Sequence, residues 1–203
     1  KLEKKSFLKR CFFTILKFDL QYLNNTYSRF AETRQSYFAL DHLREPILNN
    51  LGFIKKINPF KFLDTLNWHN PWEACSQFSH LIFFNKLNKQ SDNENFELFN
   101  YVINKYQNKD GFIYKDNKKI EANLKINGIM KFLTAVSLDQ KYLKFIKYPE
   151  KIIDFSLEKS FEEHGCDHMN IIYILKVLSQ ITHYKKEKII EYFFRRLSLI
   201  KKH

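Results

Sequence analysis

A short polar loop followed by a segment too apolar to face water occurs three times in this sequence. The loops and the segments after them are residues 67–73 with 74–87, 110–121 with 122–136, and 162–168 with 169–181. Segments with a single apolar face lie between them. A helix that is apolar all round must be buried, whereas an amphipathic helix keeps one face in water. The alternation predicts a row of helical hairpins, with the polar loops gathered at one end.

The composition agrees with an all-α fold. The 203 residues include only 4 Gly and 4 Pro, the residues that turns and hairpins between strands require. No segment alternates apolar and polar residues with a period of two, which is the pattern of a half-buried strand. We therefore expect a single domain over residues 1–203, built from about four to five helical hairpins.

Charge and cysteine content limit the partners and the compartment. The net charge is +12, and the lysines are spread along the chain instead of lining one stripe. A basic chain can bind nucleic acid, anionic lipid or anionic glycans, but solvated helix faces explain most of these lysines. We expect the partner to be an anionic glycan, a lipid-linked sugar or a protein, and not nucleic acid. The three cysteines, Cys11, Cys75 and Cys166, form no disulfide framework. No apolar run reaches the length of a membrane span, and we expect a cytoplasmic protein.

One loop carries a family resemblance. Residues 107–112, with the sequence Gln-Asn-Lys-Asp-Gly-Phe, resemble the Gln/Asp-Gly-Gly-Phe turn between outer and inner helices in the α/α toroids of terpenoid cyclases and protein prenyltransferases. The second glycine of that turn is missing, since Phe112 directly follows Gly111. The chain also looks like uncharacterised bacterial proteins with this repeat, which are often encoded beside polysaccharide-synthesis genes. The stretches that carry this second likeness are residues 32–35, 70–72, 126–131 and 164–167.

The resemblance implies a toroid-like fold and a site where the inner helices begin. A full toroid has six hairpins, so four to five would make an incomplete ring or one completed by a partner. The resemblance also implies a carbohydrate-related function. No magnesium-binding carboxylate motif, P-loop, dinucleotide fingerprint or nucleophile elbow is present, and we expect no cofactor.

The first candidate site is the loop before residue 74 together with the helix after it. Its members are Trp68, His69, Asn70, Trp72, Glu73 and His80. Tryptophan faces stack on sugar rings, and a carboxylate such as Glu73 could act as an acid or a base. The alternative is structural: the tryptophans fix the entry of the chain into the helix, and Glu73 complements the helix dipole.

The second candidate site is the densest group of possible metal ligands, His164, Cys166, Asp167 and His168. Imidazole, thiolate and carboxylate suit zinc, and the toroidal prenyltransferases use an Asp, a Cys and a His. The spacing does not match those enzymes, because Cys166 and Asp167 are adjacent and their side chains diverge. The alternative is an Asp167 that caps the next helix beside a structural cysteine. Asp167 and Glu73 are the candidate catalytic carboxylates.

The third candidate group consists of polar residues on helices that are otherwise packed. They are Arg34 and Gln35 on one helix, where Glu32 is a neighbour, and Lys125 and Asn127 on another, where Glu121 and Lys131 are neighbours. Buried polar groups require polar partners. These residues could face a ligand in a central cavity, or they could pair with one another, for example Lys125 with Glu32 or Glu121.

Three hypotheses about function follow. The first is a toroid that binds or acts on glycans, with Arg34, Gln35, Trp68, Asn70, Trp72, His80, Lys125, Asn127 and His164 as ligand-binding residues. The second is an interaction module in surface-polysaccharide synthesis. The third is prenyltransferase-like chemistry on an isoprenoid diphosphate, which would require a metal centre. We favour the first hypothesis in its binding form.

Overall fold

The computed structural model describes residues 33–37, 39–40, 43, 58–87, 92–115, 119–137, 139–158 and 165–200. Contacts divide the chain into two compact units, Lys1–Asn50 and Leu51–His203, and each is described by itself. The described residues of the first unit are all helical. The prediction of a single domain stays a prediction.

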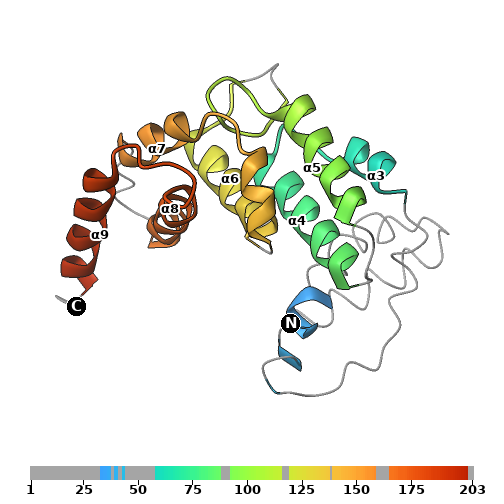
Figure 1. Cartoon of the computed structure of the whole chain (residues 1–203), viewed down its shortest axis with the longest axis horizontal. Coiled ribbons are helices and arrows are strands. Elements are labelled where there is room, and N and C mark those ends of the chain that lie inside the picture. Colours follow the sequence, from blue (N-terminus) through green and yellow to red (C-terminus); the bar gives the residue numbers. More distant parts are fainter. Residues whose placement is uncertain are drawn as a thin grey trace, which may run out of the picture. The chain divides into compact units, whose positions relative to one another are not determined.

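The second unit, Leu51–His203, is helical throughout its described part (Figure 1). Its helices are α3 (Pro59–Thr65), α4 (Pro71–Leu87), α5 (Asp92–Tyr106), α6 (Ala122–Val136), the 3-10 helix η2 (Gln140–Phe145), α7 (Pro149–Glu158), α8 (Gly165–Leu178) and α9 (Lys186–Ile200). The described residues contain no strand, only an isolated β-bridge between Gln107 and Ile113. The predicted all-α class is therefore confirmed. No helix in the described part of the chain is both long and apolar enough to cross a membrane.

Helices α4 and α6 pack directly on each other and run in the same direction. Pro71 at the start of α4 lies against Gly128 of α6, and Ser79 farther along α4 hydrogen-bonds Thr134 farther along α6, at 2.7 Å. The contacting residues thus advance along both helices in the same order, which shows that the two helices are parallel. The beginnings of α4 and α6 accordingly lie at the same end of the second unit.

Helix α8 continues this row on the other side of α6 (Figure 1). Asn170 near the start of α8 donates a hydrogen bond to Asn127, and Tyr173 lies beside Leu133, with its hydroxyl 3.4 Å from that carbonyl oxygen. Here too the contacting residues advance along both helices in the same order, so α8 runs parallel to α6. Three consecutive buried segments of the sequence therefore form one parallel row, α4, α6 and α8.

The helices between these three are the amphipathic ones. Helix α5 lies against α3 and α4, and α7 lies against α8 and α9. On α5, the buried residues Leu98, Phe99, Val102 and Ile103 recur at helical spacing, while Asn100 and Asn104 on the other face are exposed. Helix α4 in contrast is buried on nearly every side. The predicted alternation of buried and half-exposed helices is found in this unit.

Gly128 explains how α4 and α6 approach each other. A β-carbon on Gly128 would lie 2.7 Å from the Cβ atom of Pro71 and 3.0 Å from its carbonyl carbon. Only a residue without a side chain fits there, although glycine inside a helix costs about 1 kcal/mol relative to alanine. Gly128 therefore marks a close crossing of α6 with the first turn of α4.

An aromatic cluster joins four elements in the core. Phe78 of α4 stacks on Phe132 of α6 with ring centroids 5.3 Å apart, and Phe99 of α5 meets the edge of Phe132 at 5.6 Å. Tyr142 of η2 stacks on Phe99 at 4.5 Å. The sequence did not predict η2. It begins at Gln140 and is capped by Asp139, whose side chain accepts a hydrogen bond from the Lys141 amide, and it buries Tyr142.

Candidate functional site

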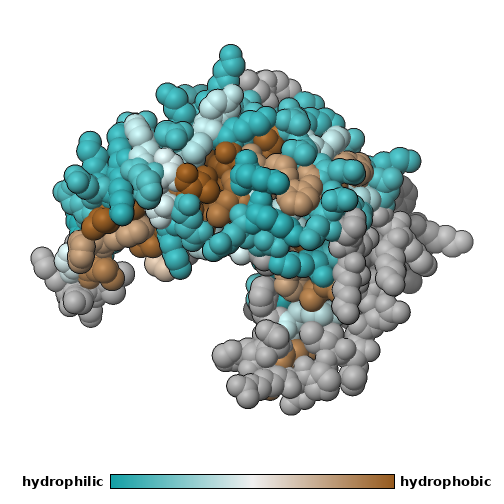
Figure 2. Space-filling view, in the orientation of Figure 1, coloured by the Kyte–Doolittle hydropathy of each residue, from teal (hydrophilic) through white to brown (hydrophobic). Residues whose placement is uncertain are grey.

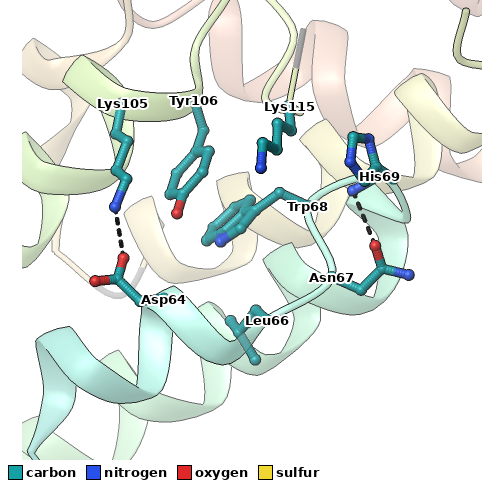
Figure 3. Close-up of a pocket in the computed structure, with 8 residues that line it drawn as sticks. All are labelled: Asp64, Leu66, Asn67, Trp68, His69, Lys105, Tyr106 and Lys115. Atoms are coloured by element: carbon teal, nitrogen blue, oxygen red, sulfur yellow. Dashed lines mark hydrogen bonds and ion pairs between the residues drawn. The ribbon is translucent and has the colours of Figure 1, made fainter. Parts of the chain in front are cut away.

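A hollow of about 250 Å³ lies where the loop between α3 and α4 meets the end of α5. We call it the Lys115 pocket. It is lined by Asp64, Leu66, Asn67, Trp68, His69, Lys105, Tyr106 and Lys115 (Figure 3). Five of these residues belong to the segment from the end of α3 to the loop before α4, and the others come from α5 and the loop after it. The pocket thus lies at the end of the second unit where α4 begins.

Local hydrogen bonds set the course of the α3–α4 loop. Asn58 caps α3 by accepting from the Lys61 amide at 3.0 Å, and Pro59 follows as the first helical residue. After α3 ends, the Trp68 amide donates to Leu66 at 3.0 Å and the Asn70 amide donates to Asn67 at 2.8 Å. These short turns place residues 66–69 along one wall of the pocket.

Trp68 belongs to that wall and is almost fully buried. Its ring stacks on Tyr106 with centroids 4.0 Å apart and planes 13° apart, and its indole Nε1 donates to the carbonyl oxygen of Leu63 at 2.8 Å. Only 2% of its surface is exposed. The stacked pair therefore holds α3, the loop and α5 together, and Trp68 offers no open face to a sugar ring.

The cation of Lys105 is already paired inside the pocket. Its Nζ lies 2.6 Å from Oδ1 of Asp64 and 2.7 Å from the Tyr101 hydroxyl, which also donates to Asp64. Hydrogen bonds from Lys105 and then from Tyr101 lower the pKa of the Asp64 carboxyl. The hydrogen bond to Asp64 is likewise the main cause that raises the pKa of Lys105. At neutral pH both groups are charged.

Lys115 differs from Lys105 because its ammonium has no hydrogen-bond or ion-pair partner in the described part of the chain. Its backbone is fixed, since the Lys115 amide donates to the carbonyl oxygen of Trp68 at 3.0 Å. Figure 3 shows its side chain extending beside Trp68, between Tyr106 and His69. The pocket therefore contains a positive charge that no described carboxylate neutralises.

Two further polar groups at the rim are also unused. Nδ1 of His69 is buried and has no hydrogen-bond partner among the described residues. The side-chain oxygen of Asn67 accepts from the His69 amide at 3.2 Å, and this leaves the Asn67 amide nitrogen free to donate. Together with Lys115, these groups could contact an anionic or hydroxyl-rich ligand.

The turn that carries the toroid resemblance positions Lys115. Gln107 donates to the carbonyl oxygens of Gly111 at 2.8 Å and of Lys147 at 2.7 Å, and it accepts from the Lys147 amide at 3.2 Å. Asn108 donates twice across the same turn, from its backbone amide to the carbonyl oxygen of Phe112 and from its side-chain amide to that of Tyr114. The side chains of this turn thus tie the loop after α5 to the start of α7.

Gly111 is required in that turn for two reasons. Its φ angle is +89°, a conformation that residues with a side chain rarely adopt. A β-carbon there would also lie 2.6 Å from Cγ1 of Ile152 in α7. Phe112, which follows Gly111 directly, is buried and packs against Phe155 with ring centroids 4.8 Å apart.

The loop residues predicted from the sequence have separate surroundings. Asn70 and Glu73 bond each other at the start of α4, where Asn70 accepts from the Glu73 amide at 3.4 Å. Trp72 is exposed over half its surface in the first turn, and His80, two turns along the helix from the exposed Glu73, is buried. Of these predicted residues only Trp68, with its neighbour His69, lines the Lys115 pocket.

Lys125 does not pair with Glu121, as the sequence suggested it could. Its Nζ lies 2.6 Å from Oδ2 of Asp110 and 4.8 Å from the centre of the Tyr114 ring. Asp110 also accepts from the Tyr114 hydroxyl at 2.9 Å. Lys125 therefore stabilises the turn, and Asn127 is occupied by its bond with Asn170. Neither residue lines the Lys115 pocket.

The remaining predicted residues lie in the first unit, outside the described residues, or on α8. Arg34 and Gln35 belong to the first unit. His164 lies outside the described residues, and so does the side chain of Cys166. Asp167 is buried in the first turn of α8, which begins at Gly165, so Asp167 is not the N-cap that the sequence suggested. Burial lowers the pKa of His168, whose Nδ1 has no described partner.

No group of three or more His, Cys, Asp or Glu side chains in the described ranges could hold a metal ion. The zinc alternative depends on His164 and Cys166 and stays a prediction. Cys75, in contrast, is fully buried in α4, and burial raises the pKa of its thiol.

Sequence reasoning missed six residues that line the pocket, Asp64, Leu66, Asn67, Lys105, Tyr106 and Lys115. Asp64 and Lys105 are 41 residues apart, and no sequence pattern links them. Lys115 lies three residues after the glycine-phenylalanine turn, and that position is the one signal that could have indicated it.

Comparison of the chain with protein-family models, with curated proteins and with solved structures finds no match.

Proposed function

We propose that this chain is a carbohydrate-binding protein and that the Lys115 pocket holds an acidic sugar residue of a glycan. The observation that carries the proposal is the Lys115 ammonium, which is unneutralised by any described residue and lies beside the free polar groups of His69 and Asn67. Charge-assisted hydrogen bonds from such a group to a carboxylate are stronger than bonds between neutral groups.

The size of the pocket supports a ligand group of about one ring. Its volume of about 250 Å³ lies just below the range of about 300–1,000 Å³ typical of sites that enclose drug-sized ligands. A sugar residue at the surface of a glycan fits this size. A long isoprenoid chain does not, and this argues against prenyltransferase-like chemistry in this pocket.

The distribution of donors and acceptors supports a sugar. Lys115 and Asn67 supply donors, and Asp64 keeps a second carboxylate oxygen that can accept from a hydroxyl. Asp64 itself is fixed by Lys105 and Tyr101, so it can contact a ligand without moving. A uronic acid presents both a carboxylate and hydroxyl groups, and it would use both kinds of contact.

Trp72 supports a second contact on the same glycan. It is half exposed and lies four residues after Trp68, in the first turn of α4. Exposed tryptophan faces stack on sugar rings. We therefore assign the neighbouring sugar residue to Trp72 instead of Trp68.

The pocket supports binding more than hydrolysis. Glycosidases place two carboxyl groups across the scissile bond, about 5–9.5 Å apart. Among the described residues that line the Lys115 pocket, Asp64 alone has a carboxylate, and it is paired with Lys105. Glu73 is exposed on α4 and Asp167 is buried on α8, and neither lines the pocket.

We also propose that the hairpins of the second unit are an arc of an α/α toroid. The parallel row of α4, α6 and α8, flanked by amphipathic helices, is what such an arc requires. A role as an interaction module is favoured by a different surface, the exposed apolar face of α9.

The test of glycan binding is a panel of short oligosaccharides in matched pairs, one member of each pair with uronic acids and the other with the parent hexoses. Binding to the acidic members is expected, with affinity falling as salt increases because the contact is ionic. Trp72→Ala should weaken binding of di- and trisaccharides and leave a single uronic acid unaffected. A panel without any hit above background would contradict the proposal.

A further inference from the structure

Helix α9 carries apolar residues on two different faces. Ile189 and Tyr192 are buried on the face that packs toward the rest of the unit, where α9 contacts α7. On another face, Ile190, Phe194 and Leu197 are 43%, 67% and 52% exposed. Residues spaced four and three apart lie on one side of a helix, so these three form a stripe. Figure 2 shows apolar side chains gathered over α9 near the C-terminus.

This stripe is more than a scattering of surface hydrophobics. Single exposed apolar residues are normal, but contiguous ones usually mark an interaction site. Phe194 is the most exposed large hydrophobic residue in the described part of the chain. The exposed stripe of Ile190, Phe194 and Leu197 is hereafter called the α9 stripe.

Charged residues along one edge of the α9 stripe indicate which partner fits it. Glu187 and Glu191 lie in the first half of α9, and Arg195 lies in the second half. All three are exposed, and no salt bridge joins them to a described residue. Lys188 lines the same hollow beside Tyr192 as Glu191 and Arg195, and its charge offsets only one of the two glutamates. The edge is therefore acidic at one end and basic at the other.

This charge pattern is complementary to that of a second α9 helix that runs in the opposite direction. In a two-fold symmetric pair of antiparallel helices, the same edge of each helix faces the same edge of the other. The midpoint of the α9 stripe lies close to Phe194. Antiparallel pairing about that point puts Ile190 opposite Leu197 of the second copy. It also brings Glu191 near Arg195 of the second copy, and this contact occurs twice by symmetry.

We propose that the α9 stripe is a dimer interface, on which the α9 helix of a second copy of this chain docks in antiparallel orientation. The pairing buries the six apolar side chains of the two stripes and joins two acidic ends to two basic ends. It uses a surface separate from the Lys115 pocket, so it does not depend on the proposed glycan binding.

The first experiment measures the mass of the full chain in solution by sedimentation velocity over a range of concentrations. The wild-type chain is expected to form a particle of about twice 24.7 kDa. Phe194→Glu should raise the dissociation constant on the order of 100-fold, because it buries a charge against apolar groups. Met169→Glu on α8 is the matched control, since Met169 is 60% exposed and lies outside the stripe.

The second experiment tests the antiparallel register by charge reversal. Glu191→Arg alone and Arg195→Glu alone should each weaken the dimer roughly tenfold, because each creates two like-charge contacts. A mixture of the two variants should associate as tightly as the wild type, since both contacts regain opposite charges. The double variant should also regain wild-type affinity.

A wild-type chain that stays monomeric at about 100 µM would overturn the proposal and leave the α9 stripe to a different partner. A dimer unaffected by Phe194→Glu would also overturn it. If the Phe194 variant dissociates but the mixed charge variants do not associate, the antiparallel arrangement is wrong. Circular dichroism of each variant establishes that a loss of association is not a loss of folding.

Discussion

Gly128 of α6 meets Pro71, the first residue of α4, so closely that a β-carbon on Gly128 would lie 2.7 Å from the Cβ atom of Pro71. This contact sets the distance between the two helices at the end of the unit where the loops of the Lys115 pocket enter α4. The β-carbon would also meet the backbone of Pro71, since the carbonyl carbon and oxygen of Pro71 would lie 3.0 and 3.1 Å from it.

Gly128→Ala should therefore destabilise the protein, although alanine is the better helix former by about 1 kcal/mol. Displacing the start of α4 costs about 1–3 kcal/mol, which exceeds the gain in helix propensity. We expect a net loss of up to about 2 kcal/mol in the free energy of unfolding, measured by urea denaturation. Asn100→Ala on the exposed face of α5 is the control and should be neutral or slightly stabilising. A Gly128 variant as stable as the wild type would show that the helices can separate freely.

Gln107 should be the most important polar side chain of the turn after α5. Gln107→Ala removes two donated bonds and one accepted bond, to Gly111 and Lys147. At about 1 kcal/mol for each bond, the expected loss is about 1–3 kcal/mol. Amide hydrogen exchange should show faster exchange at Lys147. Gln107→Glu retains the acceptor for Lys147 but faces two carbonyl oxygens without a donor, and it should be no more stable than the alanine variant.

The ion pair of Asp64 and Lys105 should make a small contribution to stability that depends on pH. The pKa of Asp64 is lowered in the folded chain, so its contribution is present above the unfolded value of about 3.9 and is lost as the pH falls through the lower folded value. The pKa of Lys105 is raised, so its contribution is lost only as the pH rises above about 10.4 toward the higher folded value.

Asp64→Asn should accordingly reduce the free energy of unfolding at pH 7 by less than about 1 kcal/mol, because both side chains are nearly half exposed and screened by solvent. The difference between variant and wild type should shrink toward pH 2 and at high salt. Urea titrations at pH 2 to 7 measure it. A difference that grows as the pH falls would contradict the assigned pairing.

The helices could be predicted because the spacing of apolar residues in the sequence reflects which faces of a helix are buried. The segment 122–136 was expected to be a buried helix, and α6 has those bounds. The apolar run after Cys166 was also recognised, but α8 begins earlier, at Gly165, since the polar residues before the run continue the helix. The 3-10 helix η2 was not expected, because its one buried side chain, Tyr142, gives no periodic signal.

The site was predictable only in part. Trp68 was identified from its loop, but the exposed face assigned to it is covered by Tyr106, a residue 38 positions away in the sequence. Lys125 was expected to face a ligand or Glu121, and it pairs with Asp110. Pairings between distant residues depend on how the helices pack, and a single sequence contains no direct record of that packing.

The most direct test of the proposed function compares two lysines of the loop between α5 and α6. Lys115→Glu and Lys119→Glu change the net charge equally and both sites are exposed, but only Lys115 lines the pocket. Titration calorimetry with galacturonate oligomers should give a dissociation constant raised about tenfold or more for the Lys115 variant, since a charge-assisted bond is replaced by repulsion. The Lys119 variant should bind like the wild type. Equal binding by the wild type and both variants would contradict the assignment of the acidic sugar to this pocket.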